Sequence, residues 1–352
     1  MQQLTLKDKW LAFGAEIKTL PMCEYVAKIS DIKTEMNALR NSVVLSDCSY
    51  VKKYAFDEVD GADFLDEKLA ANILKLRYGK AMDTFLADEN GNVAASITLV
   101  NIDDKILLFA EVIDEEAFKV LTSDNAQSLS DTHTMLSVDG PDAWKVAKKI
   151  FGADIFNIAF MAAEKYDFEG ENAIVMRTGK ASEFGYQILV PNSVSEKLFN
   201  QLKNEVDELG GLLAGVDTVL AARAKGNFFN IFAEGSKVKN PIELGIQWQI
   251  DFSKDYFCGA KAILAAREHQ QNKLIAVTSK DSIEMPCNIF NGDNKVGEIV
   301  AVDASDDKFA LALINASLAY VGQTFAKSAS SEDCFNTVSR PAIIAESLTR
   351  GF

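Results

Sequence analysis

One stretch organises this sequence: Arg177-Thr-Gly-Lys-Ala-Ser-Glu-Phe-Gly-Tyr-Gln-Ile188. Runs typical of β-strands flank it, Ala173-Ile-Val-Met176 before it and Tyr186-Gln-Ile-Leu-Val190 at its end. Because glycine has no Cβ atom, Gly179 and Gly185 mark a bend at which the backbone can approach a ligand. We therefore predict a loop between two strands that lies over a cleft. An ordinary hairpin would show the same pattern, so the rest of the chain has to decide between the two interpretations.

Length and composition predict a globular protein with a large core. The chain has 352 residues, 48% of them hydrophobic, which leaves room for two or three domains. A formal charge of -15 repels phosphate backbones, so we expect no nucleic-acid partner. The first residues lack the basic region and apolar core of a signal peptide, and no long apolar run follows. We expect a cytoplasmic protein with no membrane partner.

The cysteines and histidines give no sign of a metal site or a disulfide framework. The five cysteines are dispersed and contain no C-x-x-C pair, so we interpret them as buried thiols. Two histidines are present, His133 and His269, and neither stands in a pattern expected of a general base.

Periodicity predicts α+β architecture. We expect helices over residues 30–39, 59–71, 193–209 and 218–225, an antiparallel meander over 81–109, and short strands over 274–278, 296–302 and 309–314 that form a C-terminal barrel or sandwich. Ser193 and Glu196 form a capping box at the start of the third helix. The pattern Val59-Asp-Gly recurs as Val138-Asp-Gly, and we interpret each copy as a strand end, a tight turn and a helix start. Two related α/β subdomains would leave such a repeat.

Four further stretches give the central loop its meaning, and they follow in order along the chain: Arg40-Asn-Ser-Val-Val-Leu-Ser-Asp-Cys-Ser49, Val138-Asp-Gly-Pro-Asp-Ala143, Asn240-Pro-Ile-Glu-Leu-Gly-Ile-Gln-Trp248 with Asp251-Phe-Ser-Lys-Asp-Tyr-Phe-Cys-Gly259, and Lys295-Val-Gly-Glu298. Together with the loop they resemble the glycine-cleavage T-protein family, the folate-dependent aminomethyltransferases and their demethylase relatives.

The resemblance implies a ring of three domains with folate in the central hole. The first α/β subdomain is expected over residues 1–50 and 131–225, and the related second one over 51–130 and 226–270. A C-terminal antiparallel β-barrel is expected over 271–352.

The resemblance also implies which residues hold the folate cofactor: Gln187, Glu183, Tyr186, Trp248, Val51 and Arg223. Gln187 replaces a family glutamate that binds the pterin, and its amide offers one acceptor and one donor instead of two acceptors. Arg223 is out of register with the family's folate-contacting arginine. Trp248 is expected to pack against folate, with a place in the core as the alternative.

The catalytic position departs from the family. Family members carry an essential acid after the turn that here reads Asn90-Gly-Asn-Val-Ala-Ala-Ser96, so Ala95 and Ser96 stand in its place. Ser96 offers a hydroxyl without charge. Asp83, on the neighbouring strand, is the candidate that returns an acid to the cavity, and an exposed strand residue is the alternative. Tyr50 replaces a family histidine and is a candidate contact for the methyl donor, unless it only packs.

These features lead to three functional hypotheses. The first is a transferase or demethylase that moves a methyl or aminomethyl group from a small-molecule donor to tetrahydrofolate, with methyl transfer favoured because it needs less proton handling. The second is a non-catalytic folate-binding or regulatory protein on the same fold. The third is a glycine-cleavage aminomethyltransferase, which would need a lipoyl carrier protein as partner.

Overall fold

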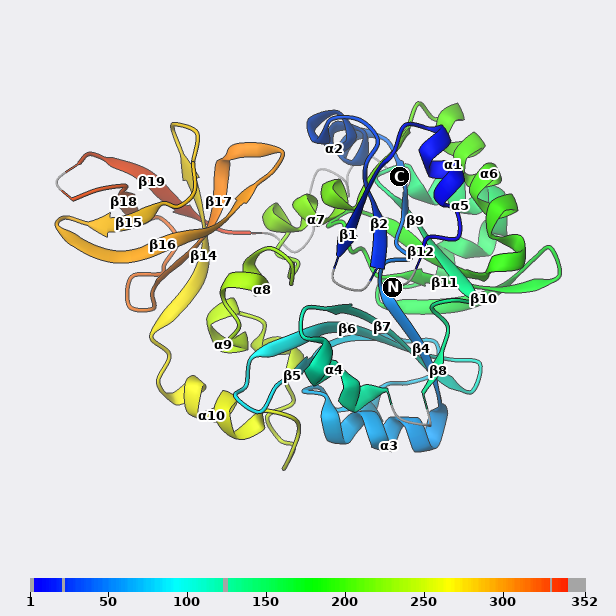
Figure 1. The fold of residues 1–352 in the computed structure, drawn as a ribbon, viewed down its shortest axis with the longest axis horizontal. Helices are drawn as coiled ribbons and strands as arrows, with labels where there is room; N and C mark the ends of the chain where they lie inside the picture. Colours follow the sequence, from blue (N-terminus) through cyan, green and yellow to red (C-terminus); the bar gives the residue numbers. More distant parts are fainter. Residues whose placement is uncertain (1–2, 21–22, 123–125, 330, 341–352) are drawn as a thin grey trace.

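The computed structural model describes residues 3–20, 23–122, 126–329 and 331–340. Two mixed α/β units lie on the right of Figure 1, one above the other, and a closed antiparallel β-barrel lies on the left. The predicted α+β fold class with a C-terminal barrel is confirmed. Residues 341–352, which were assigned to the barrel domain, lie outside the described residues.

The upper unit contains a six-stranded sheet with the order β10-β11-β12-β9-β3-β13. Its neighbours pair antiparallel, except that β13 runs parallel to β3. The strands are β3 (Val44–Asp47), β9 (His133–Asp139), β10 (Ala162–Phe168), β11 (Glu171–Arg177), β12 (Gly185–Pro191) and β13 (Leu212–Leu213). The N-terminal hairpin of β1 (Glu16–Leu20) and β2 (Cys23–Lys28) lies beside this unit.

The lower unit contains a five-stranded antiparallel sheet with the order β5-β6-β7-β4-β8. The predicted meander is confirmed, because β5, β6 and β7 pair in sequence order. The strands are β4 (Lys52–Asp57), β5 (Ala81–Ala87), β6 (Val93–Ile102), β7 (Lys105–Val112) and β8 (Gln127–Ser128).

The barrel closes through the pairing of its first and last strands, β14 and β19. Apolar residues such as Val277, Ala310 and Phe325 fill its interior. Its strands are β14 (Asn272–Ser279), β15 (Asn288–Asn291), β16 (Asn294–Asp303), β17 (Asp306–Asn315), β18 (Thr324–Ala326) and β19 (Asp333–Val338).

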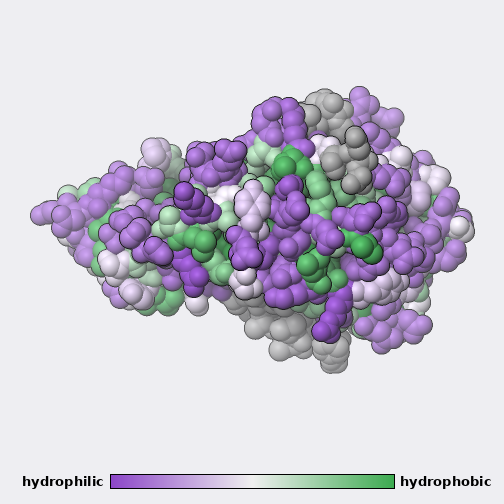
Figure 2. All heavy atoms as spheres, turned by 90° about the horizontal axis from the view of Figure 1, so that it is seen from below, coloured by the Kyte–Doolittle hydropathy of each residue, from purple (hydrophilic) through white to green (hydrophobic). Residues whose placement is uncertain are grey.

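Some helices cover the outer faces of the two sheets, and others lie between the α/β units and the barrel (Figure 1). The α-helices are α1 (Lys7–Ala12), α2 (Ile32–Asn41), α3 (Glu58–Lys68), α4 (Glu115–Phe118), α5 (Ala143–Phe151), α6 (Asn192–Glu208), α7 (Val216–Lys225), α8 (Glu234–Lys237), α9 (Pro241–Leu244) and α10 (Ala260–Glu268). No helix in the described part of the chain is long and apolar enough to cross a membrane. Polar side chains cover most of the face in Figure 2, and the apolar ones form small separate patches.

One face of the six-stranded sheet packs against helices, and the other faces the five-stranded sheet. Side chains alternate along β12, so Ile188 and Val190 join the core under α5 and α6, whereas Leu189 joins the core shared with β6 and β7. The same alternation places neighbouring residues of β12 in different environments. This layering leaves space for a site between the two sheets.

Two local predictions are corrected. Asp60-Gly61 does not form a turn, because it lies inside α3, and a Cβ atom on Gly61 would come within 2.5 Å of the Phe56 Cβ atom. The glycine therefore permits close packing of the helix on its own preceding strand. The third predicted helix begins at Asn192, and Ser193 makes no capping hydrogen bond there. The second copy of the repeat does join a strand, β9, to a helix, α5, which ends at Phe151 and is followed by Gly152 with φ of 91°.

The two sheets are joined by main-chain hydrogen bonds at one corner. Ala81 N donates to Met161 O at 2.9 Å, and Ala163 N donates to Gly79 O at 3.0 Å. An isolated bridge pairs Lys80 with Ala162 between these bonds. The edge strands β5 and β10 therefore meet beside the space between the sheets.

Candidate functional site

A cavity of about 350 Å³ lies between the two sheets, within the usual range of ~300–1,000 Å³ for small-molecule sites. Both sheets, α7, the loop after it and the Trp248 segment contribute to its wall, and the barrel contributes none of the described lining residues. The lining residues are Cys48, Tyr50, Val51, Asp83, Ser96, Thr98, Phe109, Glu111, Met135, Phe160, Met161, Lys180, Gln187, Val219, Arg223, Asn227, Phe228, Phe229, Trp248 and Gln249.

Seven of the residues predicted for the site line this cavity. They come from six separate segments of the chain, and only the fold brings them together: Tyr50, Val51, Asp83, Ser96, Gln187, Arg223 and Trp248. Ala95 is buried on the opposite face of β6, in the core under α3. Trp248 has 66% of its surface exposed, so it is not a core residue as the alternative interpretation required.

The structure does not bring Tyr186 and Glu183 to the cavity. Tyr186 precedes Gln187 on β12 and therefore points to the other face, where it is fully buried and its hydroxyl donates to Ile155 O at 3.3 Å. The Glu183 carboxylate is buried and accepts a hydrogen bond from Arg40 Nη1 at 2.7 Å. Each of these side chains therefore stabilises the protein behind the cavity wall.

Two arginines hold the central loop against α7. Arg40 donates to Ser182 O at 3.3 Å and to Ala222 O at 3.0 Å, so it links the loop to the helix. Arg223 Nε donates to Lys180 O at 3.0 Å from the cavity side. Gly179 adopts the left-handed conformation with φ of 63°, which turns the chain so that Lys180 reaches the cavity.

The helix that carries Arg223 is anchored by a buried carboxylate. Glu35 has no exposed surface, and it accepts hydrogen bonds from Gly215 N at 2.9 Å and Thr218 Oγ1 at 2.6 Å. Both donors belong to the start of α7, where a negative charge complements the helix dipole. This anchor fixes the position from which the Arg223 side chain enters the cavity wall.

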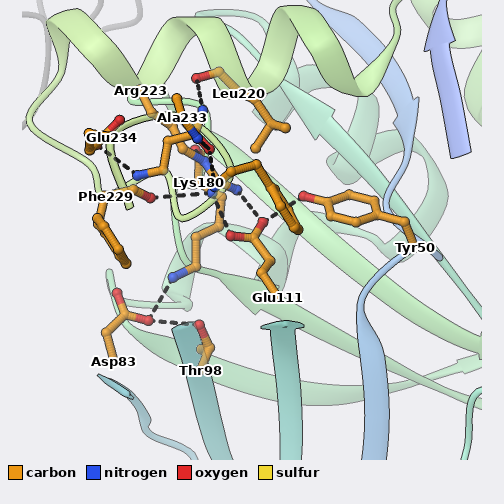
Figure 3. Close-up of polar contacts among 12 residues, drawn as sticks. Tyr50, Asp83, Thr98, Glu111, Lys180, Leu220, Arg223, Phe229, Ala233 and Glu234 are labelled. Carbon is orange, nitrogen blue, oxygen red and sulfur yellow. Dashed lines mark hydrogen bonds and ion pairs between the residues drawn. The ribbon is translucent and has the colours of Figure 1, made fainter. Parts of the chain in front are cut away.

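A buried network of Tyr50, Glu111 and Arg223 forms one side of the cavity (Figure 3). Arg223 Nη1 and Nη2 donate to the two Glu111 carboxylate oxygens at 2.8 and 2.9 Å, which is a bidentate pair. Tyr50 Oη donates to Glu111 Oε1 at 2.6 Å. Burial alone would raise the pKa of Glu111, but the Arg223 charge, the hydrogen bonds from Arg223 and Tyr50 and the nearby Lys180 charge together outweigh it and lower that pKa below its ordinary value. Glu111 is therefore held as a carboxylate.

Glu111 is one of the site residues that sequence reasoning missed, along with Lys180, Thr98 and Gln249. It is paired directly across from Ser96 on the adjacent strand, so a carboxylate lies next to the position from which the expected acid is absent. The signal was present, since Glu111 is the one charged residue within the apolar run Ile106-Leu-Leu-Phe-Ala-Glu-Val112. A buried strand rarely contains a charge without a partner.

A second ion pair spans the cavity between the two sheets. Lys180 Nζ donates to Asp83 Oδ1 at 2.6 Å, and Thr98 Oγ1 donates to the same oxygen at 2.7 Å (Figure 3). The Asp83 side chain is 11% exposed and that of Lys180 19%. The alternative that Asp83 is an exposed strand residue is therefore wrong.

Two glutamines offer neutral hydrogen-bonding groups to an occupant. Gln187 Oε1 accepts from Thr178 Oγ1 at 2.7 Å, and the Gln187 amide nitrogen makes no hydrogen bond to a described residue. Gln249 is 6% exposed, and its buried Oε1 has no hydrogen-bond partner within the described parts of the chain. A buried acceptor without a partner costs free energy, which a bound donor would offset.

A buried acid behind the cavity predicts how stability depends on pH. Burial raises the pKa of Asp139 to about 7, and Gly185 packs so closely that a Cβ atom there would lie 2.1 Å from Asp139 Oδ1. The unfolded chain has the ordinary, lower pKa, so ionising Asp139 destabilises the folded protein increasingly up to about pH 7.

We expect Asp139→Asn to increase the free energy of unfolding, relative to the wild type, by about 2 kcal/mol more at pH 8 than at pH 5. Urea denaturation at the two pH values measures this difference. Asp63 is exposed, so Asp63→Asn is the control. Its free energy of unfolding should differ from that of the wild type by the same amount at pH 5 and pH 8. Equal effects of Asp139→Asn at pH 5 and pH 8 would contradict the raised pKa.

Comparison with known proteins assigns the fold and the family. The model described as the GCVT N-terminal domain matches residues 8–254, well over half of the chain. An aminomethyltransferase of Thermotoga sp. (strain RQ2) is 24% identical over 331 residues, which is 90% of this chain and 91% of that relative. One of Lysinibacillus sphaericus (strain C3-41) is 23% identical over 338 residues, with 92% of each chain covered. The glycine cleavage system aminomethyltransferase T from Bartonella henselae superposes with a TM-score of 0.80 at 17% identity over 98% of both chains, which shows a common fold. The protein described here belongs to the glycine-cleavage T-protein family.

Proposed function

We propose that the protein is a tetrahydrofolate-dependent one-carbon transferase that moves a methyl group from a small-molecule donor, as a demethylase or methyltransferase does. Family membership supports a one-carbon transferase on this fold. When bound, tetrahydrofolate supplies N5 as the acceptor of the methyl group. The residues of the cavity support methyl transfer over aminomethyl transfer.

The cavity residues fit a pterin ring. The Gln187 amide nitrogen can donate to a ring acceptor, and the orphaned Gln249 Oε1 can accept from a ring N–H. Trp248 lines the cavity with its indole exposed, which suits stacking on a flat heterocycle. Val51 adds an apolar contact. In this proposal these four residues hold the cofactor.

The observation that carries the proposal is that both carboxylates of the described cavity wall are held in ion pairs. Ser96 replaces the expected acid, and both Glu111 oxygens are bound by Arg223 and Tyr50. Asp83 is held by Lys180 and Thr98. Releasing ammonia from an aminomethyl group requires proton delivery, for which these carboxylates are poorly placed, whereas methyl transfer requires less. In this proposal the Ser96 hydroxyl orients the donor, together with Asp83 in its ion pair with Lys180.

Mass spectrometry tests this assignment directly. The protein is incubated with tetrahydrofolate and a panel of methylated small molecules, and we expect methyl-tetrahydrofolate from at least one of them. The same protein with aminomethylated lipoyl carrier protein should release no ammonia. Ammonia release with the carrier, and no methyl product from the panel, would identify a glycine-cleavage enzyme instead.

A second candidate, a folate-binding protein without turnover, is favoured by the pairing of the charged side chains in the cavity. Each of the four, Asp83, Glu111, Lys180 and Arg223, is bound to another of the four. Such a site can hold a ligand without acting on it. Saturable tetrahydrofolate binding in a thermal-shift assay, with no product from any donor, would select this candidate. A measurable rate that falls in Asp83→Ala would exclude it.

Trp248 gives a prediction for binding. Tetrahydrofolate should quench tryptophan fluorescence in a saturable way, because the exposed indole lies at the cavity. Trp248→Leu should abolish the quench and weaken binding measured by calorimetry about tenfold, since stacking of aromatic rings contributes about 0.5–1.5 kcal/mol. Trp144→Phe is the matched control, because Trp144 packs on Phe156 away from the cavity. Wild-type affinity in Trp248→Leu would place the cofactor elsewhere.

A further inference from the structure

We propose that Asp83 and Glu111 determine the charge specificity of the cavity, so that the part of the methyl donor that enters it is uncharged. That the occupant is a methyl donor rests on the proposed function. That it carries no charge is inferred from the geometry of the cavity. The inference selects a neutral donor such as an aromatic methyl ether over a sulfonium, a quaternary amine or a donor whose carboxylate would enter the cavity.

The charges of the cavity wall cancel locally. Among the described lining residues, the two carboxylates are Asp83 and Glu111 and the two cations are Lys180 and Arg223. Lys180 and Asp83 are 2.6 Å apart, and Arg223 and Glu111 are 2.8 Å apart. Because each pair is in contact and largely buried, its field falls off quickly within the cavity. An ion of either sign therefore gains little on entering, yet it would lose its hydration.

Arg223 is not available to bind an anion. Besides the two bonds to Glu111, its Nε donates to Lys180 O at 3.0 Å and its Nη1 donates to Phe229 O at 3.4 Å. The planar fork that would recognise a carboxylate is thus already filled by Glu111. An anion that displaced Glu111 would leave a carboxylate with 8% exposure unpaired, which is strongly unfavourable.

A cation meets the same obstacle. Both Glu111 oxygens accept hydrogen bonds from Arg223, and one accepts a third from Tyr50. Asp83 Oδ1 accepts from both Lys180 and Thr98. A sulfonium or quaternary ammonium group offers no hydrogen bond with which to replace Lys180, so it would have to compete as a bare charge beside an ammonium group. The aromatic wall alone would have to compensate for that repulsion.

Three of the polar groups that remain for an occupant are neutral. They are the Gln187 amide nitrogen, the Gln249 side-chain oxygen and the Ser96 hydroxyl, one donor, one acceptor and one group that can do both. The rest of the wall is apolar or aromatic, including Val51, Phe109 and Met135. The two glutamines suit the uncharged pterin ring, and Ser96, Phe109 and Met135 leave the donor an apolar wall with one hydroxyl.

Variants that remove one member of the Asp83–Lys180 ion pair, and so leave the other charge unpaired, test the inference without folate and without turnover. Thermal unfolding is followed at constant ionic strength with acetate as the anionic probe and tetramethylammonium as the cationic probe. The wild type should show no saturable stabilisation by either. Asp83→Asn frees Lys180 and should bind acetate at least about tenfold more tightly than the wild type does. Lys180→Met frees Asp83 and should bind tetramethylammonium more tightly than the wild type does by the same factor.

A surface pair provides the control. Lys225 and Asp306 are 2.7 Å apart with side chains 37% and 39% exposed, so Asp306→Asn frees an ammonium group in solvent and should create no saturable acetate site. The partial exposure of Asp83 and Lys180 makes both variants expected to fold. Saturable stabilisation of the wild type by acetate or tetramethylammonium would overturn the inference. So would the absence of new ion binding in both variants. Because no cofactor is present, neither result depends on whether methyl transfer is found.

Discussion

Glu111→Ala is expected to lower the free energy of unfolding by about 3–5 kcal/mol, the usual cost of leaving one member of a buried ion pair alone. The variant removes the carboxylate that accepts both Nη groups of Arg223, which is 4% exposed and would keep its charge in the protein interior. Tyr50 would lose its acceptor as well. Urea denaturation at pH 7 measures the loss.

Two further variants separate the charge effect from simple loss of packing. Tyr50→Phe removes one hydrogen bond to Glu111 and should cost only about 1–3 kcal/mol. The double variant Glu111→Met with Arg223→Met replaces both charges by apolar side chains and should recover much of the stability lost in Glu111→Ala. If Glu111→Ala costs no more than Tyr50→Phe, the pair does not stabilise the fold as described.

Gly226→Ala is expected to lower the free energy of unfolding by about 2–3 kcal/mol because the added methyl group has no room. A Cβ atom on Gly226 would lie 2.0 Å from both the Cβ and Oγ atoms of Ser182 in the central loop. Ser182 is a short side chain on a loop that two arginines fix, so it cannot move aside cheaply. The helix α7 or the loop would have to shift.

Ser182→Gly should rescue Gly226→Ala. Ser182 adopts φ of 57°, a left-handed conformation that glycine accepts with less strain, and its buried hydroxyl has no hydrogen-bond partner among the described residues. Relief of the left-handed strain, about 1–2 kcal/mol, exceeds the added freedom of glycine in the unfolded chain, about 0.4–1 kcal/mol, so Ser182→Gly alone should stabilise the protein slightly. Ser182→Ala is the control, since it keeps the Cβ atom and the strained backbone and should leave the clash in place. An additive loss in the Gly226→Ala, Ser182→Gly double variant would contradict the contact.

The fold was predictable because its signals are local or shared with a family. The meander over β5 to β7 follows from alternation and turn residues, and the motif around Arg177 identified the architecture. The prediction of a turn at Asp60-Gly61 was wrong because the same dipeptide fits the interior of α3 when the glycine packs against Phe56. Tertiary packing, which no local pattern shows, decided between the two structures.

The site was predictable only where the resemblance supplied positions. Tyr186 and Gln187 were assigned together, although the period of a strand places adjacent residues on opposite faces, and only Gln187 lines the cavity. Lys180 stands at a position of the motif that any residue can occupy, and Glu111 lies on a strand outside the motifs. Their partners, Asp83 and Arg223, are distant in sequence, so pairing depended on the folded chain.

The corner where β5 meets β10 has a consequence for how the molecule can be divided. Backbone bonds from Ala81 to Met161 and from Ala163 to Gly79 make the two sheets continuous at their margins. A fragment cut between the units would expose an unpaired strand margin on each piece, a template for self-association. The two units should therefore melt in one cooperative transition, and neither should persist as a well-behaved monomer when expressed without the other.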